Sequence, residues 1–273
     1  MKIPRRLCVL VLLSILPLTA HAQQPGSVAS LSATSVPDSA ATQVFVLATP
    51  HLSNVADQFE PSMIDSLVAA LDAFGPDAIA IEKISGRQTA AMERWSGPFD
   101  RVVDNFAGLY LYHGHQVQNR TGESWSTANQ RADSLLAVAR SAAPGVDPDT
   151  RLDLVQSLTA AYRFHSAALQ WRHLPPDARA AQSLLPDTTA AALTATLDAA
   201  NEVYSIGMRL AHHRGHQRLY PIDHQAEKDR VLPVFPPLMK AIGDSMRAAL
   251  DANPVLRRVD SLETAGLASG NLL

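Results

Sequence analysis

The sequence predicts an α/β fold, with a central, mostly parallel sheet flanked by helices and a long helical insertion between strands two and three. Two strand-length apolar runs, at residues 43–48 and 77–83, enclose a helical pattern at 61–74. This order and spacing are typical of a βαβ unit, whose two strands are parallel. A third strand-like run, at residues 217–223, follows only after the insertion at about 89–214.

The first two predicted strands are apolar along most of their length. "QVFVLA" begins at Gln43, and "DAIAIEK" runs from Asp77 to Lys83. A continuous apolar run of strand length is typical of a strand that is buried on both faces. We therefore expect both strands to lie inside the sheet.

A helix is predicted between these two strands. Pro61 fits the first turn of this helix, and Gly75 fits the position just after its last residue. Between them, apolar residues repeat at helical spacing: Ile64, Leu67, Val68, Leu71 and Phe74.

Most of the remaining chain also has a helical pattern. Within the insertion we expect helices at 125–142, 150–173 and 188–214. Two further helices are expected after the third strand, at 236–251 and 254–266. Prolines near the starts of these last two helices suit the first helical turn, where a missing N–H has no cost.

The N-terminus has the pattern of a secretory signal peptide at residues 1–22. Lys2 and Arg5 supply positive charge, an apolar core follows, and "AHA" is a small-x-small cleavage signal. The apolar core is shorter than a helix that spans a bilayer. We expect a periplasmic or secreted protein without a membrane anchor after cleavage, a flexible leader at 23–42, and one α/β domain at 43–273.

The composition is that of a globular protein, with 47% hydrophobic and 18% charged residues among 273. A net charge of -3 gives no strong field, so nucleic acid is not an expected partner. The one cysteine, Cys8, lies in the predicted signal peptide, which leaves no thiol for a disulfide or a metal site. There is no P-loop, no G-x-G-x-x-G after a strand and no G-x-S-x-G. We expect the partner to be a small-molecule or peptide substrate.

A polar residue follows each of the three predicted strands. His51 comes after the first, Glu82 ends the second and Asp223 ends the third. Ligands of parallel α/β sheets bind at the carboxyl ends of the strands, so these three residues are the candidate catalytic set. A histidine and two carboxylates suit either a divalent metal ion or direct acid–base work on a bound water. The alternative is structural: a histidine after a strand often serves as a hydrogen-bonded loop residue, and a glutamate as a cap.

Other histidines offer weaker candidates. His212 and His216 have the i, i+4 spacing of metal ligands on a helix, but Gly215 suits the end of that helix and would place His216 on a turn. His113 and His115 lie in "YHGH", which we expect to be a glycine-containing loop within the insertion.

Three segments together resemble the TraB / ChaN / erythromycin esterase / Tiki-like superfamily. They are "VFVLATPHLSN" at 44–54, "GPDAIAIEK" at 75–83 and "NEVYSIGMRLAHHRGHQRLYPIDHQ" at 201–225. The third segment is similar to an uncharacterised bacterial branch of that superfamily. The resemblance implies a mixed α/β fold with its site at the strand ends, and members include ester and peptide hydrolases, some metal-dependent, and a haem-binding protein.

Matched to this superfamily residue by residue, His51 and Glu82 take the places of its histidine and glutamate. The additional polar positions of the branch correspond to Asn201, Glu202, Arg209 and Asp223. Glu202 and Arg209 are about two helical turns apart, which would place them on a similar face.

Two features depart from the superfamily pattern. The glycine of the first turn is Ala48 here, and no Gly-x-Gly-His-like turn follows residue 225. From the second departure we expect either a C-terminally truncated domain or a branch that tolerates the loss. If the late histidine of the superfamily is needed, the activity is expected to be weak or absent.

The sequence therefore predicts an exported hydrolase-like protein that cleaves esters or peptides. His51, Glu82 and Asp223 would activate water, with or without a divalent metal, and Asn201, Glu202 and Arg209 would orient the substrate. One alternative is a periplasmic protein that binds a small ligand, haem or a metal. A second alternative is a degenerate, inactive member whose polar residues are only structural.

Overall fold

The computed structural model describes residues 42–49, 51–95, 97, 99–142, 145–225 and 235–270. The chain divides into two compact units, Met1–Asn54 and Val55–Leu273. The predicted signal peptide, and the leader up to residue 41, lie outside the described residues. Among the helices that are described, none is both long and apolar enough to cross a membrane.

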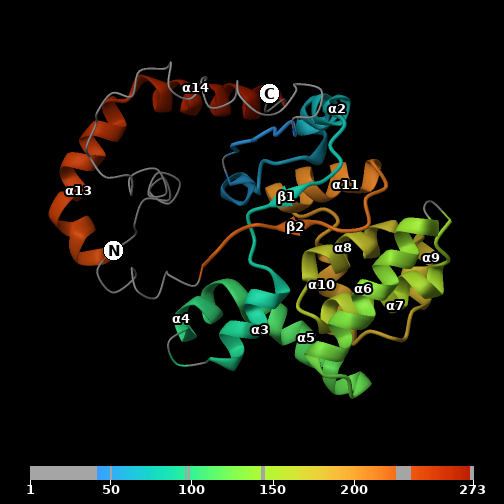
Figure 1. The fold of residues 1–273 in the computed structure, drawn as a ribbon. Helices are drawn as coiled ribbons and strands as arrows, with labels where there is room; N and C mark the ends of the chain where they lie inside the picture. Colours follow the sequence, from blue (N-terminus) through green and yellow to red (C-terminus); the bar gives the residue numbers. More distant parts are fainter. Residues whose placement is uncertain are drawn as a thin grey trace, which may run out of the picture. The chain divides into compact units, whose positions relative to one another are not determined.

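The protein is mostly helical (Figure 1). Its described residues contain two short strands, β1 at Ala80–Ile81 and β2 at Tyr220–Pro221, and no sheet flanked by helices. The predicted α/β class with a central parallel sheet is therefore wrong. Most of the chain between the two strands is helix, as expected of the insertion, and this insertion forms the bulk of the second unit.

The first predicted strand is not formed. The described residues 42–49 carry no strand, and the side chains of Val44 and Val46 are 77% and 83% exposed. An apolar run indicates a preference for burial, but a strand also needs a neighbour that supplies the ladder hydrogen bonds. The described part of the first unit contains no such neighbour. The one regular element that begins among its described residues is the short 3-10 helix η3, Leu52–Val55.

The second and third predicted strands do run side by side, and they are parallel. Ala80 pairs with Tyr220, and Ile81 pairs with Pro221. Backbone bonds extend the contact at both ends, from Tyr220 N to Ile79 O at 3.0 Å and from Ile222 N to Ile81 O at 3.0 Å. The ladder stays short in part because Pro221 has no N–H to donate.

The helix predicted between the first two strands is confirmed. A 3-10 turn, η4 at Pro61–Ile64, leads into α2 at Asp65–Phe74. Gly75 ends α2 in the left-handed conformation, with φ at 71°. A side chain at this φ would be strained, which is why glycine suits the position.

The remaining elements of the second unit are helical. In chain order they are α3 (Gly86–Arg94), α4 (Asp100–Val102), the π-helix η5 (Val103–Ala107), α5 (Gly108–Thr121), α6 (Trp125–Ala142), α7 (Pro148–Ala160), α8 (Phe164–His173), α9 (Pro176–Ala181), α10 (Asp187–Ala195), the π-helix η6 (Val203–Met208), α11 (Arg209–His213), α13 (Phe235–Ala252) and α14 (Pro254–Ser269).

Several helix predictions agree with these bounds and two do not. The prediction at 125–142 is confirmed by α6, and those at 236–251 and 254–266 are confirmed by α13 and α14 within a few residues. The single helix predicted at 150–173 is instead α7 and α8, separated by a tight turn. The one predicted at 188–214 is broken after α10, and the chain resumes a helical path only at η6.

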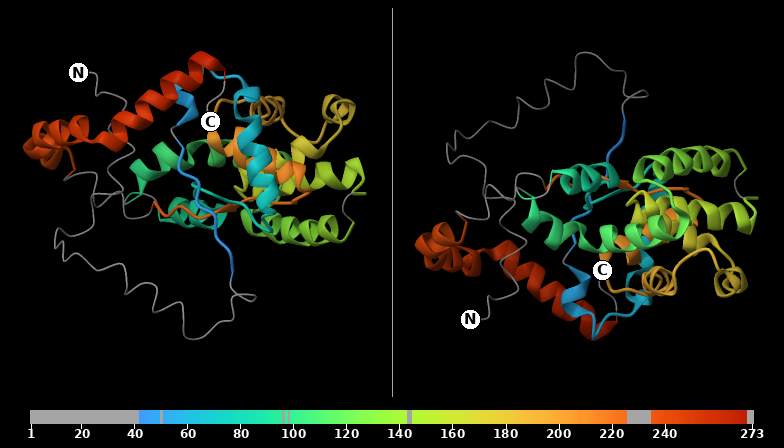
Figure 2. Two further views of the ribbon diagram at one scale, coloured as in Figure 1. Left: turned by 90° about the horizontal axis from the view of Figure 1, so that it is seen from above. Right: turned by 90° about the horizontal axis from the view of Figure 1, so that it is seen from below.

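The core of the second unit is built around α7 and α8. Figures 1 and 2 show α7 packed among α5, α6 and α8. Both α7 and α8 are buried over nearly their whole circumference. A helix that is buried on all sides has few charged residues and is apolar around its whole circumference. Its sequence therefore shows little one-sided apolar periodicity. The largest fully buried side chains include Trp171, Phe164, Leu154, Leu158 and Leu169.

The turn between α7 and α8 is held by unusually close packing. Tyr162 has a φ of 59°, a left-handed conformation that is uncommon for residues other than glycine. Gly86 lies so close to this turn that a methyl group on it would be 2.4 Å from the carbonyl oxygen of Ala161. A methyl group on Gly114 would be 2.3 Å from the Tyr162 ring. Glycine is therefore required at both positions because a side chain would clash with the turn, and not because the backbone there needs the conformational freedom of glycine.

A Gly86→Ala substitution tests this packing. The added methyl group meets a backbone carbonyl, so α3 must shift away from the α7–α8 turn. We expect the free energy of unfolding to fall by about 1–3 kcal/mol, the usual cost of overpacking, as measured by urea denaturation. Gly243→Ala is the matched control, because a methyl group there meets nothing within 4 Å and alanine favours the helix. Equal stability of Gly86→Ala and wild type would show that the turn is not tightly packed.

Candidate functional site at the ends of the parallel strands

The structure brings two of the predicted site residues to the same end of the parallel pair. Glu82 directly follows β1, Asp223 lies two residues after the end of β2, and the Asp223 N–H donates to the Lys83 carbonyl oxygen at 3.1 Å. The side chain of Glu82 is exposed, whereas Asp223 and Lys83 are half-buried. Asp223 is thus the better enclosed of the two carboxylates.

The segment that carries Asp223 is fixed by two glutamines. The side-chain amide of Gln225, which is buried, donates to the Asp223 carboxylate. With its amide nitrogen turned toward Asp223, Gln88 donates to the Asp223 carbonyl oxygen at 3.1 Å and accepts from the Gln225 N–H at 3.1 Å. Gln88 lies in the first turn of α3, where the Ser85 side chain caps its N–H at 3.2 Å. The start of α3 therefore positions the end of β2.

A buried tyrosine–histidine pair lies close to these strand ends. The hydroxyl of Tyr110, on α5, is 2.8 Å from Nε2 of His165, on α8. Burial raises the pKa of Tyr110, and the nearby Asp223 carboxylate raises it further. Burial lowers the pKa of His165 to about 3, and the Lys83 charge contributes to this decrease. The charges of Asp223 and Lys83, one from each strand end, therefore act on this pair.

The hydrogen bonding of His165 is incomplete. Within the described part of the chain, Nδ1 of His165 is buried and has no hydrogen-bond partner. The imidazole is neutral at pH 7 and carries one proton, on either nitrogen. With the proton on Nε2, His165 donates to the Tyr110 oxygen, and the Tyr110 O–H is then available to donate to a bound ligand. The pair is therefore able to present a neutral hydrogen-bond donor, the Tyr110 O–H, on which the charge of Asp223 acts.

The three residues predicted to orient substrate lie at η6 and α11. Asn201 has a local structural role, because its Oδ1 accepts from the Val203 N–H, at the first residue of η6, at 3.0 Å. Glu202 is half-buried at the start of the same element. Arg209 begins α11 and is held by the Asp65 carboxylate at 2.5 Å and the Pro61 carbonyl oxygen at 3.0 Å. Because η6 is a π-helix, the expected two-turn spacing of Glu202 and Arg209 does not apply.

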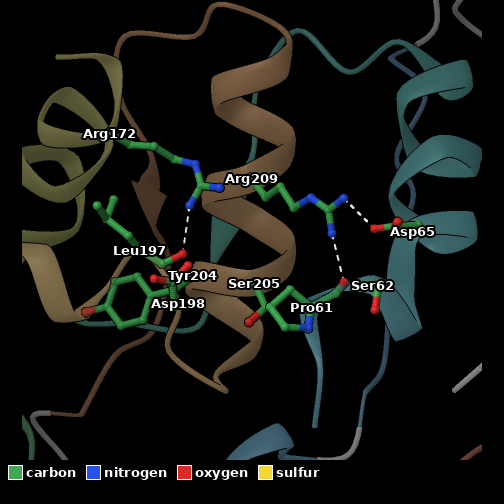
Figure 3. Close-up of a pocket in the computed structure, with 9 residues that line it drawn as sticks. All are labelled: Pro61, Ser62, Asp65, Arg172, Leu197, Asp198, Tyr204, Ser205 and Arg209. Atoms are coloured by element: carbon green, nitrogen blue, oxygen red, sulfur yellow. Dashed lines mark hydrogen bonds and ion pairs between the residues drawn. The ribbon is translucent and has the colours of Figure 1, made fainter. Parts of the chain in front are cut away.

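Arg209 lines a pocket of about 360 Å³ on the second unit (Figure 3). Tyr204 lies between this pocket and the buried pair, since it lines the pocket and its ring centroid is 5.5 Å from that of His165. The remaining lining residues come from η4, α2, α8, η6 and the segment after α10: Pro61, Ser62, Asp65, Arg172, Leu197, Asp198 and Ser205.

The weaker histidine candidates have structural partners. Gly215, with φ at 70°, lies just after the end of α11, and His216 lies on the turn that follows, as the helix-end interpretation predicted. Nε2 of His216 is 2.9 Å from the Pro76 carbonyl oxygen. The loop predicted around His113 and His115 is wrong, because both residues lie within α5. The glycine between them serves close packing against Tyr162 instead of a loop conformation.

No group of three or more histidine, cysteine or acidic side chains that could hold a metal ion occurs among the residues that the structure describes. Within the second unit, Glu82 and Asp223 belong to no such group. His51 is exposed and lies in the first unit, where its carbonyl oxygen accepts from the Asn54 N–H at 2.9 Å. Its participation in a site with Glu82 and Asp223 remains a prediction.

Sequence reasoning missed Tyr110 and His165. Each lies within a helix, and 55 residues separate them. The one local signal was a histidine in an otherwise mostly apolar, nearly uncharged stretch of α8, where a buried imidazole needs a partner. Comparison of the chain with protein-family models, with curated proteins and with solved structures finds no match. The resemblance described above therefore remains a prediction.

The depressed pKa of His165 makes stability depend on pH. The folded chain keeps this imidazole neutral down to about pH 3, whereas an unfolded chain protonates it near pH 6.5. The unfolded state binds more protons across this window, so the free energy of unfolding falls as pH decreases, by up to about 1.4 kcal/mol per pH unit from this residue.

His165→Gln removes the titrating group and retains an amide for Tyr110. We expect its urea midpoint to change less between pH 6.5 and pH 4.5 than the wild-type midpoint does, although other buried histidines keep some pH dependence. If the two proteins lost stability in parallel over this range, His165 would not be the buried neutral group described.

Proposed function

We propose that this chain is an exported hydrolase-like protein that cleaves esters or peptides at the carboxyl ends of β1 and β2. The proposal is carried by the hydrogen-bonded, buried Tyr110–His165 pair together with the half-buried carboxylate Asp223, whose charge acts on Tyr110. A carboxylate can serve as the general base for attack by water, and a neutral hydrogen-bond donor can stabilise the oxyanion that forms in acyl transfer.

In this proposal Asp223 is the general base. It takes a proton from a water molecule as the water oxygen attacks the substrate carbonyl carbon. The electron pair of the C=O bond moves onto the oxygen, which accepts a hydrogen bond from the Tyr110 O–H and is stabilised by the positive charge of Lys83. When the bond to the leaving group breaks, Asp223 returns the proton to the departing oxygen or nitrogen.

The other predicted residues take supporting roles. Glu82, exposed at the same strand end, contacts solvent-facing parts of the substrate. His51 lies in the first unit and stays a sequence prediction that the proposed mechanism does not use. His165 is a positioning residue, because it acts through the hydroxyl of Tyr110.

Hydrolysis of p-nitrophenyl acetate and of a fluorogenic peptide tests the proposal. We expect Asp223→Asn to lower kcat/KM by about 100-fold or more, the usual contribution of a general base. Tyr110→Phe, which retains the ring, should lower kcat more than it changes KM. Asp149→Asn is the matched control, because Asp149 is an exposed carboxylate in the first turn of α7. Wild-type hydrolysis no faster than buffer, or equal rates for Asp223→Asn and wild type, would contradict the proposal.

A second candidate function, binding of a small ligand without catalysis, is favoured by the pocket at Arg209. Its volume lies within the range of small-molecule sites. Of the ligands considered from the sequence, a small polar molecule suits this lining better than haem, because most of the pocket side chains are polar or charged.

A further inference from the structure

The pocket beside α11 contains two oppositely charged pairs of residues, and the pairs differ. Arg209 and Asp65 are joined by a hydrogen-bonded ion pair of 2.5 Å, and both are satisfied by it. Arg172 and Asp198 also line the pocket, yet they form no ion pair with each other or with another described residue. One side of the pocket is thus neutralised and the other side is not.

The guanidinium of Arg172 has unused hydrogen-bonding capacity. It is half-buried near the end of α8, and within the described ranges its hydrogen bond runs from Nη1 to the Leu197 carbonyl oxygen at 3.0 Å. A guanidinium carries five N–H donors, so most of them lack a protein acceptor there. Burial lowers the pKa of Arg172, while the carboxylate of Asp198 opposes this shift. The two charges therefore interact across space without direct contact.

Asp198 is the complementary group. Its side chain is exposed, and it has neither a hydrogen bond nor an ion pair with any residue that the structure describes. In Figure 3 it lies with Leu197 and Tyr204 on the same side of the pocket as Arg172. A carboxylate and a guanidinium that share a pocket in this way offer separate positions for a cationic and an anionic group.

We propose that this pocket binds a small zwitterion of the amino-acid or short-peptide class. Its carboxylate pairs with Arg172, in the planar geometry that guanidinium groups favour. Its ammonium group pairs with Asp198, and its apolar part lies against Pro61, Leu197 and the ring of Tyr204.

The charges of the lining distinguish a zwitterion from simpler ligands. The four ionised residues of the pocket are two arginines and two aspartates, so the lining has no net charge. A simple anion would gain from Arg172 but be repelled by Asp198, and a simple cation would experience the reverse. Matched opposite charges give both attraction and selectivity. This inference does not depend on hydrolysis at the strand ends.

Isothermal titration calorimetry with two zwitterions, L-leucine and L-leucylglycine, tests the inference. The two probes differ in the separation between their charges. N-acetyl-L-leucine carries only the carboxylate, and L-leucinamide carries only the ammonium group. We expect at least one zwitterion to bind, and both single-charge analogues to bind at least tenfold more weakly than it does.

Two variants and their controls assign the binding to this pocket. Arg172→Gln and Asp198→Asn should each weaken binding of the zwitterion at least tenfold. Arg140→Gln and Asp149→Asn alter exposed residues of the same types and should leave the affinity unchanged. Asp198→Asn is expected to fold normally because Asp198 makes no described contact that folding would lose. The inference is overturned if neither zwitterion binds at millimolar concentration, if an analogue binds as tightly as the zwitterions, or if Asp198→Asn binds like wild type.

Discussion

The tight turn between α7 and α8 is the constraint on which the rest of the second unit depends. Tyr162 holds a left-handed conformation there, and Gly86 and Gly114 allow α3 and α5 to approach it. Carbonyl groups at the end of α7 lack helical partners, and side chains satisfy them: Gln118 donates to Ala160 at 2.7 Å. The turn therefore aligns the helices that carry Gln88, Tyr110 and His165. The geometry of the candidate site at the strand ends depends on this alignment.

The position of β2 depends on α8 in turn. Gln170 donates to the Gln217 carbonyl oxygen at 2.6 Å, and Ser166 accepts from the Leu219 N–H at 3.2 Å. The buried guanidinium of Arg151 bonds to both Gln170 and Gln217 and has no carboxylate partner among its described bonds. A buried charge held by amides makes these contacts costly to break, because loss of one leaves the guanidinium unsatisfied. The segment that leads into β2, and so to Asp223, is therefore tied to the same helix that carries His165.

Local features were predictable from the sequence, and long-range features were not. The helical segment of η4 and α2 followed from Pro61, Gly75 and the regular apolar spacing between them, all of which act within a few residues. The break at Tyr162 was not predictable, because tyrosine is not a turn residue and the conformation depends on glycines far away in the chain. The prediction of a strand at 43–48 was wrong because an apolar run does not reveal whether a neighbouring strand is available for pairing.

The candidate site was predictable to a similar extent. The parallel pairing that brings Glu82 and Asp223 to one end followed from two strand-like runs, although the sheet is much smaller than expected. Arg209 was chosen through a resemblance, as a residue that orients substrate, and that role stays a prediction; the structure places it in a polar pocket. No sequence motif marks the other residues of the two sites, because segments distant in sequence bring them together only in the folded chain: Tyr110, His165, Arg172 and Asp198.

The most direct test of this account is the protonation state of His165, observed by NMR in the chain labelled with ¹⁵N-histidine. The account predicts that the His165 imidazole is neutral at pH 5, as half-buried His173 also is, and that the His165 nitrogen signals shift in Tyr110→Phe and stay unchanged in Tyr112→Phe, since Tyr112 is exposed. If instead every histidine titrated near pH 6.5 and no signal responded to Tyr110→Phe, the buried pair beside Asp223 would not exist as described.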